Sequence, residues 1–462
     1  MSAQVDGVTR RWFVKSAAAA SAGFVGLRAL AGDGSVRGGG RRLLAHPAVG
    51  PIRKDPRGVF DLPSGFSYEV IARRGEEMAD GLLVPDKPDG MASLPLAGGL
   101  TALICNHENS TTPDHASAFG PRDERLDRVD RSKLFDAGYG KSPSRGGTTT
   151  IVYDTERGEK VRQFLSLGGT VRNCAGGATP WGTWLTCEET HVRRDGEHER
   201  DHGWVFEVPA TAEPVLHRAE PIRAMGRFDH EAVCVDPRTG IVYQTEDIGD
   251  GLFYRYIPVE PGRLSAGGKL QALSVAGRPS LETSNRAGRS VRPGERMRAE
   301  WVDLEDVESP RNDLHERGFA AGAARFARGE GCVWADGSAY VVCTSGGAAR
   351  KGQVWRHTPG ETAEEGGWLE LFVEPADGSV VDMPDNCCAA PWGDLVLCED
   401  NARDETFLVG VTREGELYHL ARNALSSSEL AGCTFSPDGS TLFVNIQHDG
   451  LTLAVRGPWP VG

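Results

Sequence analysis

The chain has 462 residues and a formal net charge of −14, with 65 acidic against 51 basic side chains. Because nucleic acid attracts basic surfaces, this acidity argues against a nucleic-acid partner. The sequence contains 59 glycines and 27 prolines, which are typical of abundant turns. It shows almost no amphipathic helical pattern after its N-terminal region. The composition therefore favours an all-β fold.

The first 32 residues are predicted to be a twin-arginine signal peptide. Arg10 and Arg11 stand before Trp-Phe-Val-Lys, and an apolar run from Ser16 to Leu30 follows them. The run ends in Ala-Leu-Ala, which is typical of signal-peptidase cleavage. It is too short and too weakly apolar for a stable membrane anchor. We therefore expect the twin-arginine export machinery as a partner and a periplasmic or extracellular location.

Residues 33–57 are rich in glycine and arginine, which predicts a flexible lead-in. The remaining residues, 58–462, are long enough for several average domains or for one large propeller. The repeats described next favour one domain. We expect a single β-propeller domain that acts as a monomer.

Six stretches of this domain repeat one unit, which is a strand, a glycine-containing turn and a second strand. Polar residues, mostly acids and amides, stand where the unit begins and where it ends. The repeats cover residues 89–108, 173–189, 229–247, 330–344, 385–400 and 432–448. Other short alternating strands lie between them, and the longer gaps predict loop insertions.

In an antiparallel hairpin the start of the first strand lies beside the end of the second. Each repeat therefore brings its polar residues to one end of its hairpin. Repeats of this length with short strands are typical of a β-propeller, whose blades surround a central channel. We predict a six-bladed propeller with a cluster of acidic residues on its axis.

These acidic residues are candidate metal ligands. Carboxylate oxygens suit Ca²⁺ and Mg²⁺, and so many of them would repel one another unless cations balanced their charge. Cys174 takes the place of an acid or amide, and a thiolate suits a transition metal such as iron. The candidate carboxylate ligands are Glu108, Glu188, Glu189, Glu231, Glu246, Asp247, Glu330, Asp385, Glu399 and Asp400.

Three histidines in the repeats leave two interpretations open. His107, His230 and His448 could bind a metal through nitrogen or could support its ligands. The cysteines other than Cys174 lie mostly in inner strands, where they are expected to pack as small apolar residues. A disulfide between neighbouring strands also stays open, because sequence alone does not settle it.

At these residues the chain resembles the PhoX-type alkaline phosphatases, which are exported propeller enzymes with a mixed iron and calcium centre. The resemblance covers nearly all of the chain after the signal peptide. Its most specific part is Asn-Cys-Ala-Gly-Gly through Cys-Glu-Glu. The matching stretches are residues 106–109, 173–189, 226–247, 325–331, 384–386 and 434–448.

The resemblance implies a phosphatase that hydrolyses phosphate monoesters. It implies that Cys174 binds Fe³⁺ and that the glutamates of the repeats bind Fe³⁺ and Ca²⁺. It also implies that Arg325 or Arg328 holds the phosphate oxygens, and it makes Asn106 a further candidate catalytic residue. Metal-assisted hydrolysis fits these parts, because clustered cations neutralise the ester and activate water.

Two other functions remain open. One is a calcium-dependent propeller hydrolase of another class, such as a lactonase, which would need only hard cations. The other is a non-catalytic binding propeller stabilised by its metals. A serine hydrolase is excluded by the absence of Gly-x-Ser-x-Gly, and no phosphate-binding glycine loop precedes a helix.

Overall fold

The computed structural model describes residues 42, 43, 45–111, 116–401, 403 and 405–460. The predicted signal peptide, residues 1–32, lies outside them. Strands are the main regular structure of the described residues, long loops and short turns connect them, and α2 (Leu314–Ala320) is a short α-helix on the outside. None of the helices in this part of the chain is long and apolar enough to cross a membrane. The expected all-β propeller is confirmed.

Each repeat found in the sequence is the inner hairpin of a blade. Alternation of apolar and polar residues produces the strands, and glycine-containing turns join them. The six inner hairpins are β4 (Pro88–Pro95) with β5 (Leu100–His107), β8 (Asn173–Ala178) with β9 (Thr183–Glu188), β11 (His230–Val235) with β12 (Val242–Glu246), β17 (Gly329–Ala335) with β18 (Ser338–Cys343), β21 (Pro384–Ala389) with β22 (Leu395–Glu399), and β25 (Leu430–Phe435) with β26 (Thr441–Ile446).

Outer strands extend each hairpin by antiparallel pairing. They are β6 (Gly146–Asp154) and β7 (Glu159–Thr170), β10 (Val205–Pro209), β13 (Gly251–Pro258) and β14 (Gly268–Val275), β19 (Gln353–Thr358) and β20 (Trp368–Val373), β23 (Phe407–Val411) and β24 (Leu417–Asn423), and β27 (Leu451–Arg456).

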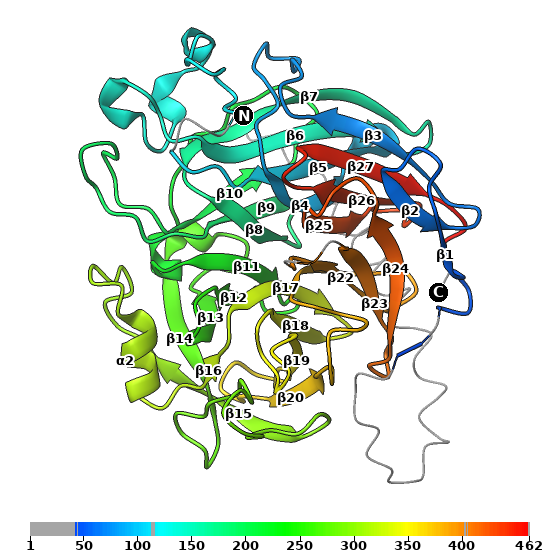
Figure 1. Cartoon of the computed structure of the whole chain (residues 1–462). Coiled ribbons are helices and arrows are strands. Elements are labelled where there is room, and N and C mark those ends of the chain that lie inside the picture. The colour runs from blue at the N-terminus through cyan, green and yellow to red at the C-terminus, as the bar shows by residue number, and fades with distance from the viewer. Residues whose placement is uncertain (1–41, 44, 112–115, 402, 404, 461–462) are drawn as a thin grey trace.

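The first strands of the six hairpins form a ring around the axis. β4 packs against β8, β8 against β11, and so on through β17, β21 and β25 back to β4 (Figure 1). Glycine makes this close approach possible. A Cβ atom on Gly90 would lie 2.6 Å from the Cα of Ala175, and one on Gly331 would lie 2.6 Å from the Asp385 carbonyl oxygen. The ring therefore leaves almost no space between neighbouring backbones.

Hydrogen bonding does not divide the propeller into six separate sheets. β15 (Arg296–Asp303) pairs with β14 on one side and β20 on the other, so two blades share one ten-stranded sheet. β16 (Arg325–Phe326) pairs with β13. The segment that carries β15, α2 and β16 is an insertion between two inner hairpins, as the sequence led us to expect.

The propeller is closed by strands from both ends of the chain. β3 (Ser67–Arg73) completes the last blade by pairing with β27, so blue and red strands lie side by side in Figure 1. β2 (Phe60–Pro63) pairs with β24, and β1 (Ile52–Arg53) pairs with β2.

The described part of the expected flexible lead-in is packed onto the propeller. The Val49 side chain is buried in a core cluster, and the Leu43 amide donates to the Leu417 carbonyl at 2.7 Å. Asp55 accepts from the Val59 amide at 2.9 Å. The folded domain therefore begins before residue 58, because these N-terminal residues find partners on the last blades.

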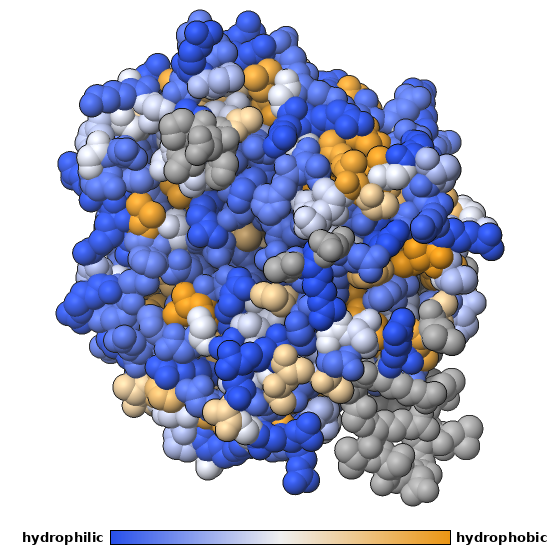
Figure 2. All heavy atoms as spheres, in the orientation of Figure 1, coloured by the Kyte–Doolittle hydropathy of each residue, from blue (hydrophilic) through white to orange (hydrophobic). Residues whose placement is uncertain are grey.

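Apolar side chains fill the spaces between neighbouring blades. Val396 and Leu408 of one blade pack with Val444 and Leu453 of the next, and all four are buried. The face shown in Figure 2 is covered mainly by hydrophilic residues, with apolar residues scattered among them. The fold therefore buries much of its apolar surface between neighbouring blades.

Candidate metal centre

A β-bulge near the start of the inner strand re-aims one side chain in each of five blades. β4, β8, β11, β17 and β21 all shift register directly after their first residue. The extra residue of a bulge breaks the alternation of the strand. The first bulge residues are Asp89, Cys174, Glu231, Glu330 and Asp385, and all are buried. In β25 the shift falls between Ala431 and Thr434, where no acid stands.

A second set of side chains comes from the residue that follows each inner hairpin. In all six described hairpins its amide donates to the carbonyl of the residue before the hairpin, at 2.9 to 3.3 Å. This bond fixes the position of the hairpin end. Because side chains alternate along a strand, the last strand residue and the residue after it then point in opposite directions. The donors are Glu108, Glu189, Asp247, Thr344, Asp400 and Gln447.

The two sets combine into two groups of possible metal ligands. Glu108, Cys174 and Glu189 offer ligand atoms within 4.8 Å of one another, and so do Glu231, Glu330 and Asp385. We call these the thiolate group and the carboxylate group. The two groups are close neighbours: the Cys174 thiol lies 3.5 Å from Asp89, and burial and the Asp89 and Glu231 carboxylates raise its pKa.

The electrostatics of the centre indicate missing positive charge. Burial, and then the Glu108 carboxylate, raise the pKa of Asp89 to about 8. Burial and neighbouring carboxylates likewise raise the pKa values of Glu231 and Asp385 well above their usual range. Asp89 Oδ1 and Glu231 Oε2 are buried and have no hydrogen-bond partner among the residues that the structure describes. Multivalent cations would relieve this repulsion, so the residues fit metal ions.

Three basic residues supply part of the balancing charge. Lys87 lies 3.2 Å from Glu108. Arg172 donates to Glu108 at 3.0 Å and to Glu189 at 2.5 Å. Each of the three basic residues stands directly before an inner strand and has a positive backbone φ. The angles are 45° for Lys87, 51° for Arg172 and 57° for Arg328. Such a backbone conformation is costly for a side-chain-bearing residue, and it often marks a functional site.

The two candidate phosphate-binding arginines lie in different places. Arg328 donates to both oxygens of Asp247, at 2.8 and 2.7 Å, and contacts Glu330 at 2.7 Å. Arg325 instead pairs with Asp250 at 3.2 Å and lies over the Phe319 ring. The structure therefore brings Arg328 to the centre and directs Arg325 away from it.

Three of the expected ligands point into their blades. Glu188, Glu246 and Glu399 are the last residues of their inner hairpins, and their carboxylates accept backbone amides at the start of the next strand. Each of these three carboxylates points to the side of its strand opposite to the side chain of the next residue, which is Glu189, Asp247 or Asp400. The amide donors are Gly203 at 2.8 Å, Leu252 at 3.0 Å and Phe407 at 2.9 Å, respectively.

Asn106 holds the thiolate group in place from a neighbouring blade. Its amide nitrogen donates to the carbonyls of Cys174 and Ala175, at 3.1 and 2.7 Å. Its oxygen accepts from Trp184 and Thr186, both at 2.8 Å. The side chain is fully buried and all its polar atoms are used. Asn106 therefore positions the backbone that carries Cys174, and its catalytic role stays a prediction.

Two other blades use the same arrangement. Asn445 donates to the Asp89 carbonyl at 2.6 Å, and Thr245 donates to the Glu330 carbonyl at 2.5 Å. Both donors lie one residue before the end of their inner hairpin. The backbone of three of the five bulges is thus held by the adjacent blade.

The three candidate histidines have separate environments. His107 is buried between the Asp86 carbonyl and Thr149, both at 3.0 Å. His230 contacts the Gly226 carbonyl and stacks on Phe228, and burial lowers its pKa to about 3. His448 is largely exposed. None of these three belongs to either ligand group of the described residues.

Sequence reasoning missed some members of the centre. Asp89 begins the first repeat at the position that Cys174 occupies in the second, so alignment of the repeats would have identified it. Gln447 donates to Asp89 at 2.6 Å and to Glu108 at 3.2 Å. The only sequence feature that could have indicated Arg172 is its position directly before Asn173 and Cys174.

The structure is similar to that of PhoX from Pseudomonas fluorescens, which was solved in complex with vanadate, a transition-state analogue. The two sequences are 17% identical, the match covers 91% of this chain and 98% of that chain, and the TM-score is 0.63. It also matches a gluconolactonase, XC5397 from Xanthomonas campestris, at 13% identity, with 86% and 98% covered and a TM-score of 0.38. No curated protein sequence matches.

Fold and site together define a β-propeller with an acidic centre that can hold metals on its axis. The family model described as alkaline phosphatase PhoX matches residues 48–450. The chain therefore belongs to the PhoX family of alkaline phosphatases, and the resemblance found in its sequence is confirmed.

Proposed function

We propose that this protein hydrolyses phosphate monoesters at a mixed iron and calcium centre on the propeller axis. The observation that carries the proposal is the single thiol among buried carboxylates. Membership of the PhoX family supports phosphate-ester hydrolysis. A calcium-dependent lactonase would need only hard cations, and the thiolate group gives no reason for that alternative.

The two ligand groups suit different metals. Glu108, Cys174 and Glu189 combine two carboxylates with one thiol, which fits iron. The carboxylate group offers oxygen ligands alone, which fits calcium. Asp89, with an unpartnered buried oxygen between them, is available to either metal.

When bound, such metals neutralise the oxygens of a phosphate ester and lower the pKa of bound water. The chain itself orients the substrate. Arg328 is held rigidly by Asp247 and Glu330 through Nε and Nη2. Its Nη1 makes no hydrogen bond within the described residues, so it can donate to a phosphate oxygen with a permanent charge.

The test is to measure metal content and activity together. Protein exported by its native route should contain both iron and calcium by mass spectrometry and should hydrolyse para-nitrophenyl phosphate. Chelation should remove activity, and re-adding the two metals should restore it. Full activity in protein that holds neither metal would refute the proposal.

We further propose that the protein is exported by the twin-arginine route. Arg10 and Arg11 before Trp-Phe-Val-Lys support this. Replacing both arginines by lysine should leave the uncleaved precursor in the cytoplasm, which immunoblotting of cell fractions measures. Normal export of that variant would contradict the proposal.

A further inference from the structure

An apolar cavity of about 250 Å³ lies on the axis next to the metal centre. It is lined by residues that follow the bulges in all six inner strands, and none of its lining residues is charged. Five of them are cysteines, which is half of the ten in the chain. The lining cysteines are Cys234, Cys332, Cys387, Cys388 and Cys433.

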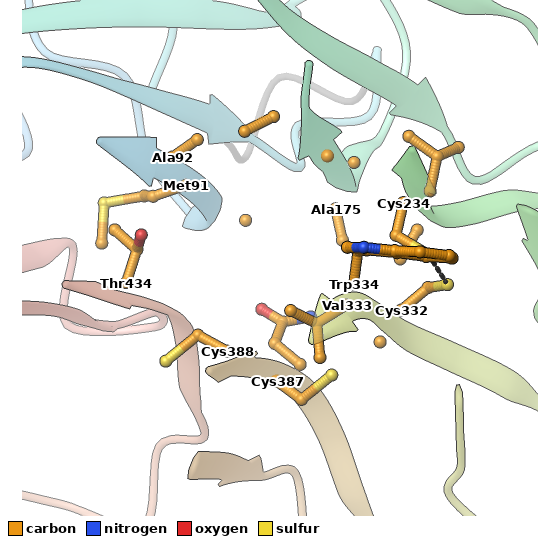
Figure 3. A pocket seen from close by; sticks show the side chains of 18 of the residues that line it. Met91, Ala92, Ala175, Cys234, Cys332, Val333, Trp334, Cys387, Cys388 and Thr434 are labelled. Carbon is orange, nitrogen blue, oxygen red and sulfur yellow. Dashed lines mark hydrogen bonds between the residues drawn. The ribbon is translucent and has the colours of Figure 1, made fainter. Parts of the chain in front are cut away.

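Two of these cysteines lie unusually close together. The sulfur atoms of Cys234 in β11 and Cys332 in β17 are 3.1 Å apart, and both are free thiols. Figure 3 shows them side by side at the cavity wall, next to the Trp334 ring. A disulfide bond is about 2.05 Å long, so the sulfurs need to approach by only about 1 Å. Their strands belong to neighbouring blades, and the inner strands are already in contact.

We propose that Cys234 and Cys332 are an oxidation site, at which a small neutral hydroperoxide that enters the cavity forms a disulfide between two blades. In the first step one sulfur attacks a peroxide oxygen, an S–O bond forms, the O–O bond breaks, and water leaves. In the second step the other sulfur attacks the sulfenic sulfur, an S–S bond forms, and a second water leaves. Two thiols and one hydrogen peroxide thus give one disulfide and two waters.

The cavity selects the oxidant. Only 4% of Cys234 and 6% of Cys332 is exposed, so a reactant has to pass through the cavity. A charged or bulky oxidant would lose its hydration in a space without charged residues, which is costly.

The disulfide would join two blades at the axis. The two residues are 98 positions apart, and the loop between them contains all of β12 to β16. β15 already joins the same two blades at their outer edge. Closing so long a loop restricts the unfolded chain, and we expect the melting temperature to rise by about 5 °C.

The metal-loaded protein should be treated with hydrogen peroxide, quenched with catalase, and unfolded in an alkylating agent without reductant. The number of alkylated cysteines should fall from ten to eight. Peptide mapping should find Cys234 joined to Cys332. A thiol count that stays at ten, or a disulfide that joins a different pair, would overturn the proposal.

Variants separate this pair from the other thiols of the cavity. Cys332→Ser and Cys234→Ser should abolish both the disulfide and the rise in melting temperature. Cys387→Ser, in the same cavity, should retain both. Glutathione disulfide, which is large and charged, should leave the pair reduced. Equally fast oxidation by glutathione disulfide would contradict access through the cavity.

Discussion

Two regions of this propeller bury several carboxylates, and they balance the charge differently. In one blade Glu188 and Asp136 flank His202 at 2.6 and 3.2 Å, and all three side chains are fully buried. Burial alone would lower the pKa of His202, but Glu188 and Asp136 raise it to about 9. This blade site therefore carries its own cation.

The axial centre has too few cations of its own. Of the described lysines and arginines, only Lys87, Arg172 and Arg328 are in ion pairs with its acids. Its nine acids are Asp89, Glu108, Glu189, Glu231, Asp247, Glu330, Asp385, Asp400 and Glu429. The blade site balances its carboxylates within the chain, whereas the axial centre has an excess of carboxylates that fits the metal ions we propose there.

The largest expected effect is at the thiol of the axial centre. Cys174→Ser should remove iron and lower kcat/KM for para-nitrophenyl phosphate by about 1,000-fold or more, because a serine hydroxyl is a poor substitute for a thiolate. Metal analysis and steady-state kinetics measure both effects. Circular dichroism should show the fold intact.

Cys187→Ser is the matched control. Cys187 lies in the second strand of the same hairpin and is fully buried in an apolar cluster. Its replacement should cost some stability and leave the iron content unchanged. Equal iron loss in both variants would mean that these cysteines act through folding.

His202→Gln tests the internally balanced site. Because its pKa is raised in the folded state, His202 stabilises the protein fully below its unfolded pKa of about 6.5, and this stability is lost as pH rises through about 9. The variant should lose about 3 kcal/mol of unfolding free energy at pH 7, since two buried carboxylates lose their cation. By pH 10 the difference from wild type should shrink, which denaturant unfolding measures.

His191→Gln is the control for this pH dependence. His191 also contacts a carboxylate, Asp229 at 2.7 Å, but about half of its side chain is exposed. An exposed pair contributes little, so its loss should change stability by less than about 1 kcal/mol. If the His202→Gln variant still loses stability as pH rises through about 9, another titrating group causes that loss.

Substitutions at Arg328 and Arg325 compare an arginine at the metal centre with an arginine outside it. Arg328→Lys should lower kcat/KM by about 100-fold, because lysine cannot hold Asp247 with two parallel hydrogen bonds and still reach the phosphate. Arg325→Lys, at the pair with Asp250, should change it by less than about 3-fold. Equal effects of the two substitutions would contradict the placement of Arg328 beside the substrate.

Much of the fold followed from the sequence because the inner hairpins repeat. Glycine turns and alternating strands mark each hairpin, so the propeller and the convergence of its ends were predictable. The shared ten-stranded sheet was not, because β15 lies in an insertion without a repeat. The packing of β1, within residues 45–57, also depends on a distant partner, β24, which no local pattern reveals.

The candidate site was predictable as a group and less so residue by residue. Glu188 and Glu189 are adjacent, and only the position where the strand ends decides which one faces the blade. Asp89 was missed although it stands where Cys174 stands in the second repeat, because the first repeat matches the others less closely. The positions of Lys87 and Arg172 depend on a left-handed backbone turn, which usually signals glycine and not a basic residue.

The most direct test of the difference between the axial centre and the blade site is to replace one aspartate by asparagine in each of them. Asp385 belongs to the carboxylate group, where burial and neighbouring acids raise its pKa. Its folded form therefore prefers to be neutral, and keeping it charged above its unfolded pKa costs stability in metal-free protein. Asp385→Asn should raise the unfolding free energy of metal-free protein at pH 8 by about 1 kcal/mol. The stabilisation gained on adding calcium should fall.

Asp136→Asn should have the opposite sign. Asp136 is paired with His202 and accepts the Gly138, Glu199 and Arg200 amides, and these contacts outweigh burial and lower its pKa. Losing its charge should destabilise the protein by about 2 kcal/mol with or without calcium. If Asp385→Asn also destabilises metal-free protein, the axial carboxylates are balanced within the chain, and the charge argument for bound metals fails.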